Sequence, residues 1–285
     1  MHDDRPSRTA YRVAVRRALH QKLDRPPVLD DPMALKILGE EVDTAESHGS
    51  ASMRAFMAAR ARFAEDELAA AYAAGVRQCV VLGAGLDTFA YRNPFGGLRV
   101  IEVDHPATQA WKRELLAAAG IAESATFVPV DFTRQNLALE LALGGFGMRE
   151  PAFFSWLGVV PYLSREAAFE TLGWIASLPA STVVFDYAVD PSLLNAVERA
   201  ALEALSERVA RAGEPFQLFF EPDKLAADLS ALGFCQMVDL SSDAINGRYF
   251  AGRADGLRVR GNVGRMIAAT STRTSMRHAW TRAPR

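Results

Sequence analysis

The spacing of apolar residues divides the chain into a helical first quarter and a later region in which short strands alternate with helices. Residues 9–23 carry apolar side chains at helical spacing, which predicts an amphipathic helix. A second helix is expected over residues 32–38, because Asp31 is a favourable N-cap and Pro32 fits the first helical position. A third is predicted over residues 51–74.

From residue 78 onward the pattern changes to short runs rich in apolar and β-branched residues. These runs are QCVVL, RVIEV, ATFVPV, AFFSWL and TVVFDY, followed near the end of the chain by CQMVDL and RMIAAT. Continuous apolar runs indicate strands buried on both faces, and helices between them indicate parallel βαβ units. The fold class is therefore α/β, with a doubly wound, mostly parallel sheet of seven strands.

A chain of 285 residues suits one large α/β domain with additions. We expect residues 1–75 to form a helical N-terminal extension and residues 76–285 to form the core. A long amphipathic helix follows the fifth strand and predicts a helical lid at about residues 190–213. Ligands of doubly wound sheets bind outside the carboxyl ends of the strands, so this lid is expected to cover the acceptor pocket.

Composition narrows the class of partner. The formal net charge of −2 gives no reason to expect nucleic acid or an anionic membrane as a partner. The two cysteines, Cys79 and Cys235, are far apart and sit among apolar residues, which indicates small core residues rather than a disulfide framework. We expect a cytoplasmic monomer or homodimer without a metal site. The Arg-rich segment from Ser271 to the end is interpreted as a solvated tail.

A glycine loop follows the first predicted strand in the segment VVLGAGLDTFAYR. Gly83, Ala84 and Gly85 let backbone N–H groups approach a ligand without a Cβ in the way. A dinucleotide fingerprint would have a third glycine where this chain has Thr88, and Asp87 beside it would repel a pyrophosphate. The loop therefore fits a positively charged ligand better, such as the amino group and sulfonium of S-adenosylmethionine.

The next two strands also deliver acids to the same edge of the sheet. Glu102 and Asp104 end the second strand, where an acid accepts hydrogen bonds from ribose hydroxyls. Spacing alone does not separate these two candidates. Asp131 follows the third strand and is placed to accept an adenine amino group, while Phe132 offers apolar contact to the ring.

Several long segments together resemble one family. They are the glycine-loop segment, IEVDHPATQAWKRELL, VPVDF, SWLGVVPYLSREA and RYFAGRADGL. The chain resembles the leucine carboxyl methyltransferase-like family over about residues 31–270. This family holds class I S-adenosylmethionine-dependent O-methyltransferases, including protein phosphatase methyltransferases and bacterial enzymes that methylate polyketides. The resemblance implies S-adenosyl-L-methionine as cofactor, S-adenosyl-L-homocysteine as product, and a small-molecule or peptidic acceptor.

The resemblance also implies roles for single residues. Asp104 would bind the ribose, and an arginine of the preceding helix would bind the cofactor carboxylate. That arginine is Arg60, with Arg62 as the alternative. Many relatives carry an acid where this chain has Leu157, so one contact to the cofactor amino group is missing or comes from backbone, and Trp156 would line the space near the methyl group.

Tyr162, Arg248 and Tyr249 are the candidate catalytic residues, because they could hold an acceptor carboxylate by hydrogen bonds and charge. No histidine is convincingly placed to act as a base, and a carboxylate is already ionised at pH 7. We therefore expect methyl ester formation. The alternatives are a hydroxyl or phenol O-methyltransferase, a nicotinamide-dependent oxidoreductase, and a non-catalytic protein that binds adenosylmethionine.

Overall fold

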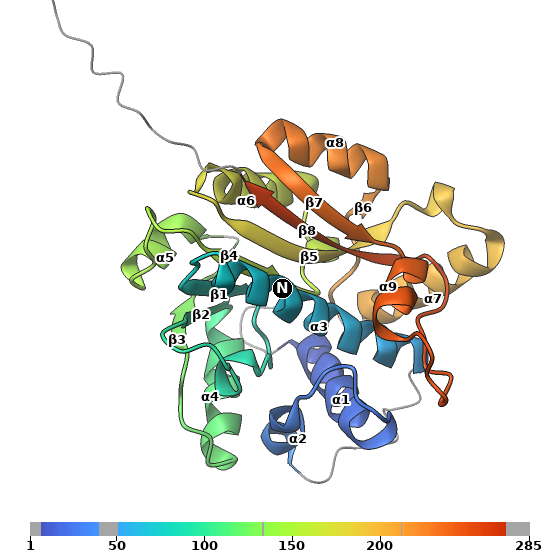
Figure 1. Ribbon diagram of the computed structural model, residues 1–285, viewed down its shortest axis with the longest axis horizontal. Helices are drawn as coiled ribbons and strands as arrows, with labels where there is room; N and C mark the ends of the chain where they lie inside the picture. The colour runs from blue at the N-terminus through green and yellow to red at the C-terminus, as the bar shows by residue number, and fades with distance from the viewer. Residues whose placement is uncertain (1–6, 40–50, 133, 212, 272–285) are drawn as a thin grey trace, which may run out of the picture.

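The computed structural model describes residues 7–39, 51–132, 134–211 and 213–271 (Figure 1). Its first helices match the predicted ones and are α1 (Arg8–Leu23), α2 (Pro32–Leu38) and α3 (Ala51–Ala73). Asp31 caps α2 by accepting from the Ala34 N–H, Pro32 begins the helix, and Gly39 follows it at a φ of 80°. The local sequence signals at this helix are therefore confirmed.

The central sheet contains eight strands, seven of them in the order β3-β2-β1-β4-β5-β8-β7. The strands are β1 (Gln78–Leu82), β2 (Arg99–Asp104), β3 (Thr126–Pro129), β4 (Phe153–Trp156), β5 (Thr182–Val189), β6 (Phe219–Phe220), β7 (Phe234–Leu240) and β8 (Gly264–Ser271). Only β8 runs antiparallel to its neighbours, and the short β6 pairs with the end of β5. The predicted α/β class with a mostly parallel sheet is confirmed.

Helices cover both faces of this sheet, as a doubly wound fold requires. The apolar residues of β1 alternate between two cores: Val80 and Leu82 belong to one, Cys79 and Val81 to the other. On the first face lie α5 (Leu137–Leu143), α6 (Arg165–Ser177) and α8 (Pro222–Leu232); on the second lie α3 and α9 (Ser242–Tyr249). Helix α4 (Pro106–Ala118) packs through Leu116 near Leu86.

The strand register brings the glycine loop and the predicted acids to one edge. Leu82 at the end of β1 pairs with Val103, and Asp104 at the end of β2 pairs with Pro129 of β3. On the other side of β1, Val81 pairs with Ser155 of β4. The segments that follow these four strands therefore lie next to one another.

The helical insertion after β5 differs in detail from the prediction. It is divided into a 3₁₀ turn at Pro191–Leu193 and the helix α7 (Ala196–Arg211). Within this amphipathic helix the apolar Val197 is 80% exposed, whereas Leu202 and Val209 are buried. Asn195 accepts from the N–H groups of the first helical turn, which moves the start of the helix and turns Val197 outward.

Three further outcomes concern single features. Cys79 is buried, but Cys235 is exposed, so its prediction as a core residue is wrong; it lies on β7 at the edge of the sheet, where one face meets solvent. Within the described ranges, no helix combines the length and the apolar character needed to cross a membrane. The predicted Arg-rich tail after Ser271 lies outside the described residues.

Candidate active site

The glycine loop is shaped by close packing of its neighbours. Gly83 and Gly85 have φ values of 65° and 48°, a region that L side chains rarely adopt. A Cβ at Gly83 would lie 2.3 Å from a methyl carbon of Val159, and one at Gly85 would lie 2.9 Å from the Cβ of Ala10. On these two sides the loop after β4 and helix α1 approach the glycine backbone closely, and the approach of a ligand to the loop stays a prediction.

Asp104 lies at the tip of β2 and holds the same loop. Its Oδ2 accepts from the Gly85 N–H at 2.6 Å, and its Oδ1 accepts from the His105 N–H at 2.7 Å. Burial raises the pKa of Asp104, and the bonds from Gly85 and His105 offset part of that rise. Each carboxylate oxygen has two lone pairs, so Asp104 retains acceptor capacity for hydroxyl groups beyond the strand end.

Glu102, the alternative to Asp104, is enclosed inside the protein. Its Oε2 lies 2.5 Å from the Lys112 Nζ, and both side chains are about 1% exposed. Burial raises the pKa of Glu102 to about 7, although Lys112 acts in the opposite direction. This geometry favours Asp104 as the ribose-binding candidate.

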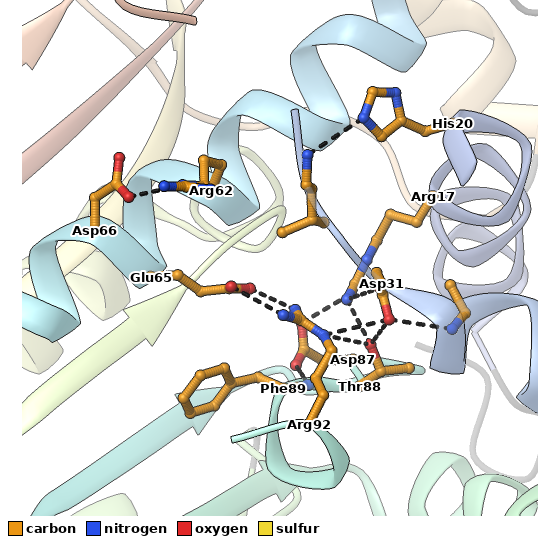
Figure 2. Close-up of polar contacts among 12 residues, drawn as sticks. Arg17, His20, Asp31, Arg62, Glu65, Asp66, Asp87, Thr88, Phe89 and Arg92 are labelled. Atoms are coloured by element: carbon orange, nitrogen blue, oxygen red, sulfur yellow. Dashed lines mark hydrogen bonds and ion pairs between the residues drawn. The ribbon is translucent and has the colours of Figure 1, made fainter. Parts of the chain in front are cut away.

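Asp87 joins the loop to the N-terminal helices (Figure 2). Its Oδ1 accepts from the Phe89 N–H, and its Oδ2 accepts from the Arg17 guanidinium, both at 2.8 Å. Arg17 also reaches Asp31 at 2.5 Å and Thr88 at 2.7 Å. Both oxygens of Asp87 thus already hold partners, and the role of Asp87 toward a cofactor amino group stays a prediction.

Arg60 of α3 lies among the ends of the strands. Its Nη1 donates to Oδ2 of Asp186 on β5 at 2.8 Å, and Oδ1 of Asp186 accepts from the Gly158 N–H at 2.6 Å. A Cβ at Gly158 would lie 2.9 Å from both Nη atoms of Arg60. The guanidinium therefore lies against the backbone directly after β4, a contact that the sequence analysis did not foresee.

The neighbouring Arg62 points elsewhere. Its Nε donates to Asp66 one helical turn further along α3 at 2.7 Å, and about half of its side chain is exposed (Figure 2). Of the two arginines considered from the sequence, Arg60 is the one beside the segment that follows β4. This favours Arg60 as the residue that meets the cofactor carboxylate.

Beyond β3, Asp131 and Phe132 form the other end of the candidate site. The Asp131 side chain is about one-fifth exposed and lies 3.5 Å from the Arg134 guanidinium. Phe132 is 40% exposed, which is unusual for a large apolar ring. An exposed ring beside a carboxylate suits the stacking and the amino-group contact that adenine needs.

Tyr162 follows β4 in the 3₁₀ turn Val160–Tyr162. Burial raises its pKa, the Glu214 charge adds to the rise, and the charges of Arg60 and Arg16 oppose it. Its phenol is therefore neutral near pH 7 and able to donate a hydrogen bond. The ring stacks near Phe216 with centroids 5.1 Å apart, which places the turn against the segment after α7.

Trp156 and Leu157 end β4 on opposite faces of the sheet. Trp156 is buried in the first core, and its indole N–H has no hydrogen-bond partner among the described residues. Leu157 packs on the second core with α3. The apolar Leu157 side chain is thus accommodated by the α3 interface.

Arg248 and Tyr249 lie on α9 and contact α3. Tyr249 donates to Asp66 at 2.9 Å, and the Arg248 guanidinium lies 3.3–3.4 Å from Glu67 and Asp66. The charges that act on Tyr162 and on Tyr249 belong to different residues. The structure therefore does not bring these two residues together with Tyr162 through any described contact.

Comparison with known proteins follows this geometry. The model of the family "Leucine carboxyl methyltransferase" matches residues 10–176. The candidate S-adenosyl-L-methionine-dependent methyltransferase YktD of Bacillus subtilis is 32% identical over 295 aligned positions, covering 90% of this chain and 95% of that protein. A similarly named protein of Mycolicibacterium vanbaalenii is 30% identical, covering 87% of this chain and 90% of its own.

A solved structure shows the same fold. The crystal structure of a candidate methyltransferase from Thermobifida fusca superposes with a TM-score of 0.59 at 17% identity and covers 91% of this chain and 94% of that one. The fold is that of class I methyltransferases. The chain belongs to the leucine carboxyl methyltransferase family, and the family-level resemblance predicted from the sequence is confirmed.

The residues at the strand ends fit the S-adenosylmethionine that this family implies. Asp104 has acceptor capacity left at the tip of β2, Phe132 presents an exposed ring, and the buried Trp156 N–H lacks a described partner. Such a set offers acceptors to hydroxyl groups and a surface to a flat ring. Within the described residues, no group of three or more His, Cys, Asp or Glu side chains could hold a metal ion.

Replacing Asp104 by alanine tests the ribose assignment. We expect adenosylhomocysteine to bind more weakly by about 1–3 kcal/mol, because its hydroxyl groups lose a charged acceptor. Calorimetry measures this, with Asp190→Ala as control, since Asp190 is a partly exposed cap after β5 whose side chain bonds only to the neighbouring Ser192 among the described residues. Equal affinity in Asp104→Ala and the parent protein would remove Asp104 from the site.

Proposed function

We propose that this protein is an S-adenosylmethionine-dependent O-methyltransferase that esterifies a carboxylate of a small-molecule or peptidic acceptor. Family membership supports methyl transfer. The observation that supports the choice of acceptor is that His20 and His105, the histidines of the described residues, are engaged away from Tyr162, by Asp24 and by the start of α4.

The proposed cofactor orientation follows the geometry of the strand ends. Asp131 and Phe132 hold the adenine, Asp104 holds the ribose, and the glycine loop supports the chain that leads to sulfur. Arg60 binds the cofactor carboxylate through the guanidinium N–H groups that do not bond to Asp186. A guanidinium suits this role because it can donate two parallel hydrogen bonds to one carboxylate.

The chemistry is a single displacement. When bound, S-adenosylmethionine supplies an electrophilic methyl carbon on a sulfonium that departs as a neutral thioether. The acceptor carboxylate would take this methyl group through one oxygen lone pair, and the electron pair of the broken C–S bond would stay on sulfur. One negative and one positive charge disappear together, and no proton is transferred, so the protein has to align the acceptor and exclude water.

The described side chains suit an acceptor that needs no base. His20 bonds to Asp24 and to the backbone of residues 28–29, and His105 caps α4. Tyr162 is neutral at pH 7, as a tyrosine ordinarily is, and the rise in its pKa keeps it so at higher pH; it can therefore serve as a hydrogen-bond donor that orients the acceptor. Arg248 and Tyr249 would have to release Asp66 and Glu67 to meet an acceptor, so the proposal rests on Tyr162.

A panel of acceptors tests this proposal. With methyl-donor consumption as readout, we expect turnover with carboxylic acids and peptides that carry free carboxylates, and none with phenols. A carboxylate has a pKa of about 4, so the rate is expected to change little between about pH 6 and pH 8. Turnover confined to phenols, with a rate that climbs steadily over that range, would overturn the carboxylate assignment.

A further inference from the structure

One face of α1 carries polar atoms that the proposed reaction does not use. Thr9, Arg12 and Arg16 are spaced so that they share this face, adjacent to the face by which Ala10 and Arg17 contact the glycine loop. The Thr9 Oγ1 and the Arg16 Nε are buried without a hydrogen-bond partner among the described residues. Buried polar groups are nearly always satisfied, so two such atoms on one face indicate a missing partner.

The segment after α7 closes over the N-terminal end of this helix. Ser7, the N-cap of α1, donates to the Glu214 Oε1 at 2.9 Å, and the adjacent segment packs on Tyr162 through Phe216. The same segment is held by the Gln217 side chain, which donates to the Tyr162 carbonyl at 2.8 Å. Helix α1, the end of α7 and the turn with Tyr162 thus lie around one region.

Positive charges outnumber negative ones around Arg16, and the acid of the adjoining segment is Glu214, which accepts from Ser7. Burial lowers the pKa of Arg16, and the charges of Arg208, Arg12 and Arg60 lower it further, while only Tyr162 acts in the opposite direction. No carboxylate of the described residues lies within ion-pair distance of Arg12, Arg16 or Arg208. Arginines that share a site without an acid repel one another, which is unfavourable unless an anion joins them.

We propose that Arg12 and Arg16 of α1 and Arg208 of α7 form an anion-binding subsite that holds a second negatively charged group of the methyl acceptor. This inference rests on the proposed function and narrows the acceptor to a molecule with two anionic groups. One is the carboxylate that receives the methyl group beside Tyr162. The other, a carboxylate or a phosphate, stays charged and is held by the arginines.

A second anionic group suits a cluster of arginines better than the reacting carboxylate does. Guanidinium hydrogen bonds withdraw electron density from the oxygen that must attack, and esterification removes the charge that the arginines recognise. A second anion keeps its charge throughout the reaction. Its binding energy then positions the reacting carboxylate, which is how contacts remote from the chemistry raise a rate.

Calorimetry with inorganic phosphate and with glutarate tests the subsite without turnover. The protein is titrated in the presence of adenosylhomocysteine, as the parent chain and as Arg16→Gln, Arg208→Gln and Arg211→Gln. Arg211 is the matched control, because it lies on the same helix, is 77% exposed and already pairs with Glu207. Arg208 is exposed on α7, so its replacement is expected to leave the fold intact.

We expect at least one of the two anions to bind the parent chain. Its Kd should rise about tenfold in Arg16→Gln and in Arg208→Gln, and remain unchanged in Arg211→Gln. Preference for phosphate or for glutarate identifies which group the acceptor carries. If neither anion binds the parent chain, or if all four proteins bind it with equal affinity, the anion-binding subsite is wrong. If the anions bind as expected but no carboxylate is methylated, the subsite stands and the proposed function is wrong.

Discussion

Arg17→Met is expected to destabilise the folded protein by about 3 kcal/mol, because it removes the nearest counter-ion of the buried Asp31 and of Asp87 and leaves Asp31 only Arg92, at 3.3 Å. Arg17 reaches Asp31 at 2.5 Å and Asp87 at 2.8 Å, and Asp31 is fully buried. These contacts tie α1 and α2 to the glycine loop, which Figure 2 shows in one view. The substitution therefore removes the positive charge that balances these carboxylates and the contacts that hold the glycine loop against α1.

Denaturant unfolding measures this change, with Arg113→Met as control. Arg113 pairs with Glu123 at the surface, where both side chains are about half exposed, so its loss should change the free energy of unfolding by less than about 1 kcal/mol. Similar losses in the two variants would contradict the structural role assigned to Arg17.

The effect of Arg17→Met should also depend on pH. Burial alone would raise the pKa of Asp31, but the charges of Arg17 and Arg92 outweigh it and lower the pKa below its ordinary value. A group with a lowered folded-state pKa contributes stability above its unfolded value of about 4 and loses it as pH falls through the folded-state value. The difference between parent and variant should therefore be largest at neutral pH and narrow in acid.

Arg60→Gln is expected to weaken adenosylhomocysteine binding by about 10- to 100-fold, since a charged hydrogen bond to the cofactor carboxylate is lost. The substitution also leaves Asp186 without its cation, so binding is measured well below the melting transition of the variant. Arg60→Lys keeps the charge but not the two-pronged geometry, and we expect an intermediate affinity.

Arg62→Gln is the matched control for Arg60, because Arg62 lies on the same helix and pairs only with Asp66. Its affinity for adenosylhomocysteine should equal that of the parent protein. A loss in Arg62→Gln with none in Arg60→Gln would exchange the two roles.

Much of the fold is predictable because local signals agree with the final structure. Asp31, Pro32 and Gly39 mark the ends of α2, and continuous apolar runs mark β1 and β5. The two-residue β6 is too short to leave a pattern, and α9 buries only Ser242 and Ile245, so neither could be found from periodicity.

The candidate site is predictable only in outline. Glu102 and Asp104 are two positions apart and share one strand face, so spacing cannot tell which one reaches the edge. They differ because β2 ends at Asp104, whereas Glu102 is enclosed and paired with Lys112, and both facts depend on tertiary structure. The partners of Arg17 lie far along the chain, and no local pattern distinguishes a buried arginine from an exposed helix charge.

The contacts that set the glycine loop are likewise long-range. The glycines predict a close approach to the backbone, but the sequence does not indicate that Ala10 and Val159 make it. Asp186 lies far along the chain from Arg60, and the sequence does not indicate that it pairs with Arg60 and accepts from the Gly158 N–H. The residue types thus predict which chemical groups lie at this site, but not which residues contact them.

The product of the reaction tests the central claim most directly. The product formed from adenosylmethionine and the best acceptor of the panel is isolated and treated with mild alkali, and released methanol is measured. A carboxyl methyltransferase gives a methyl ester, so we expect one methanol to be released for each adenosylhomocysteine formed. A methylated product that survives the same treatment and releases no methanol would be an ether, and it would contradict the assignment of a carboxylate acceptor.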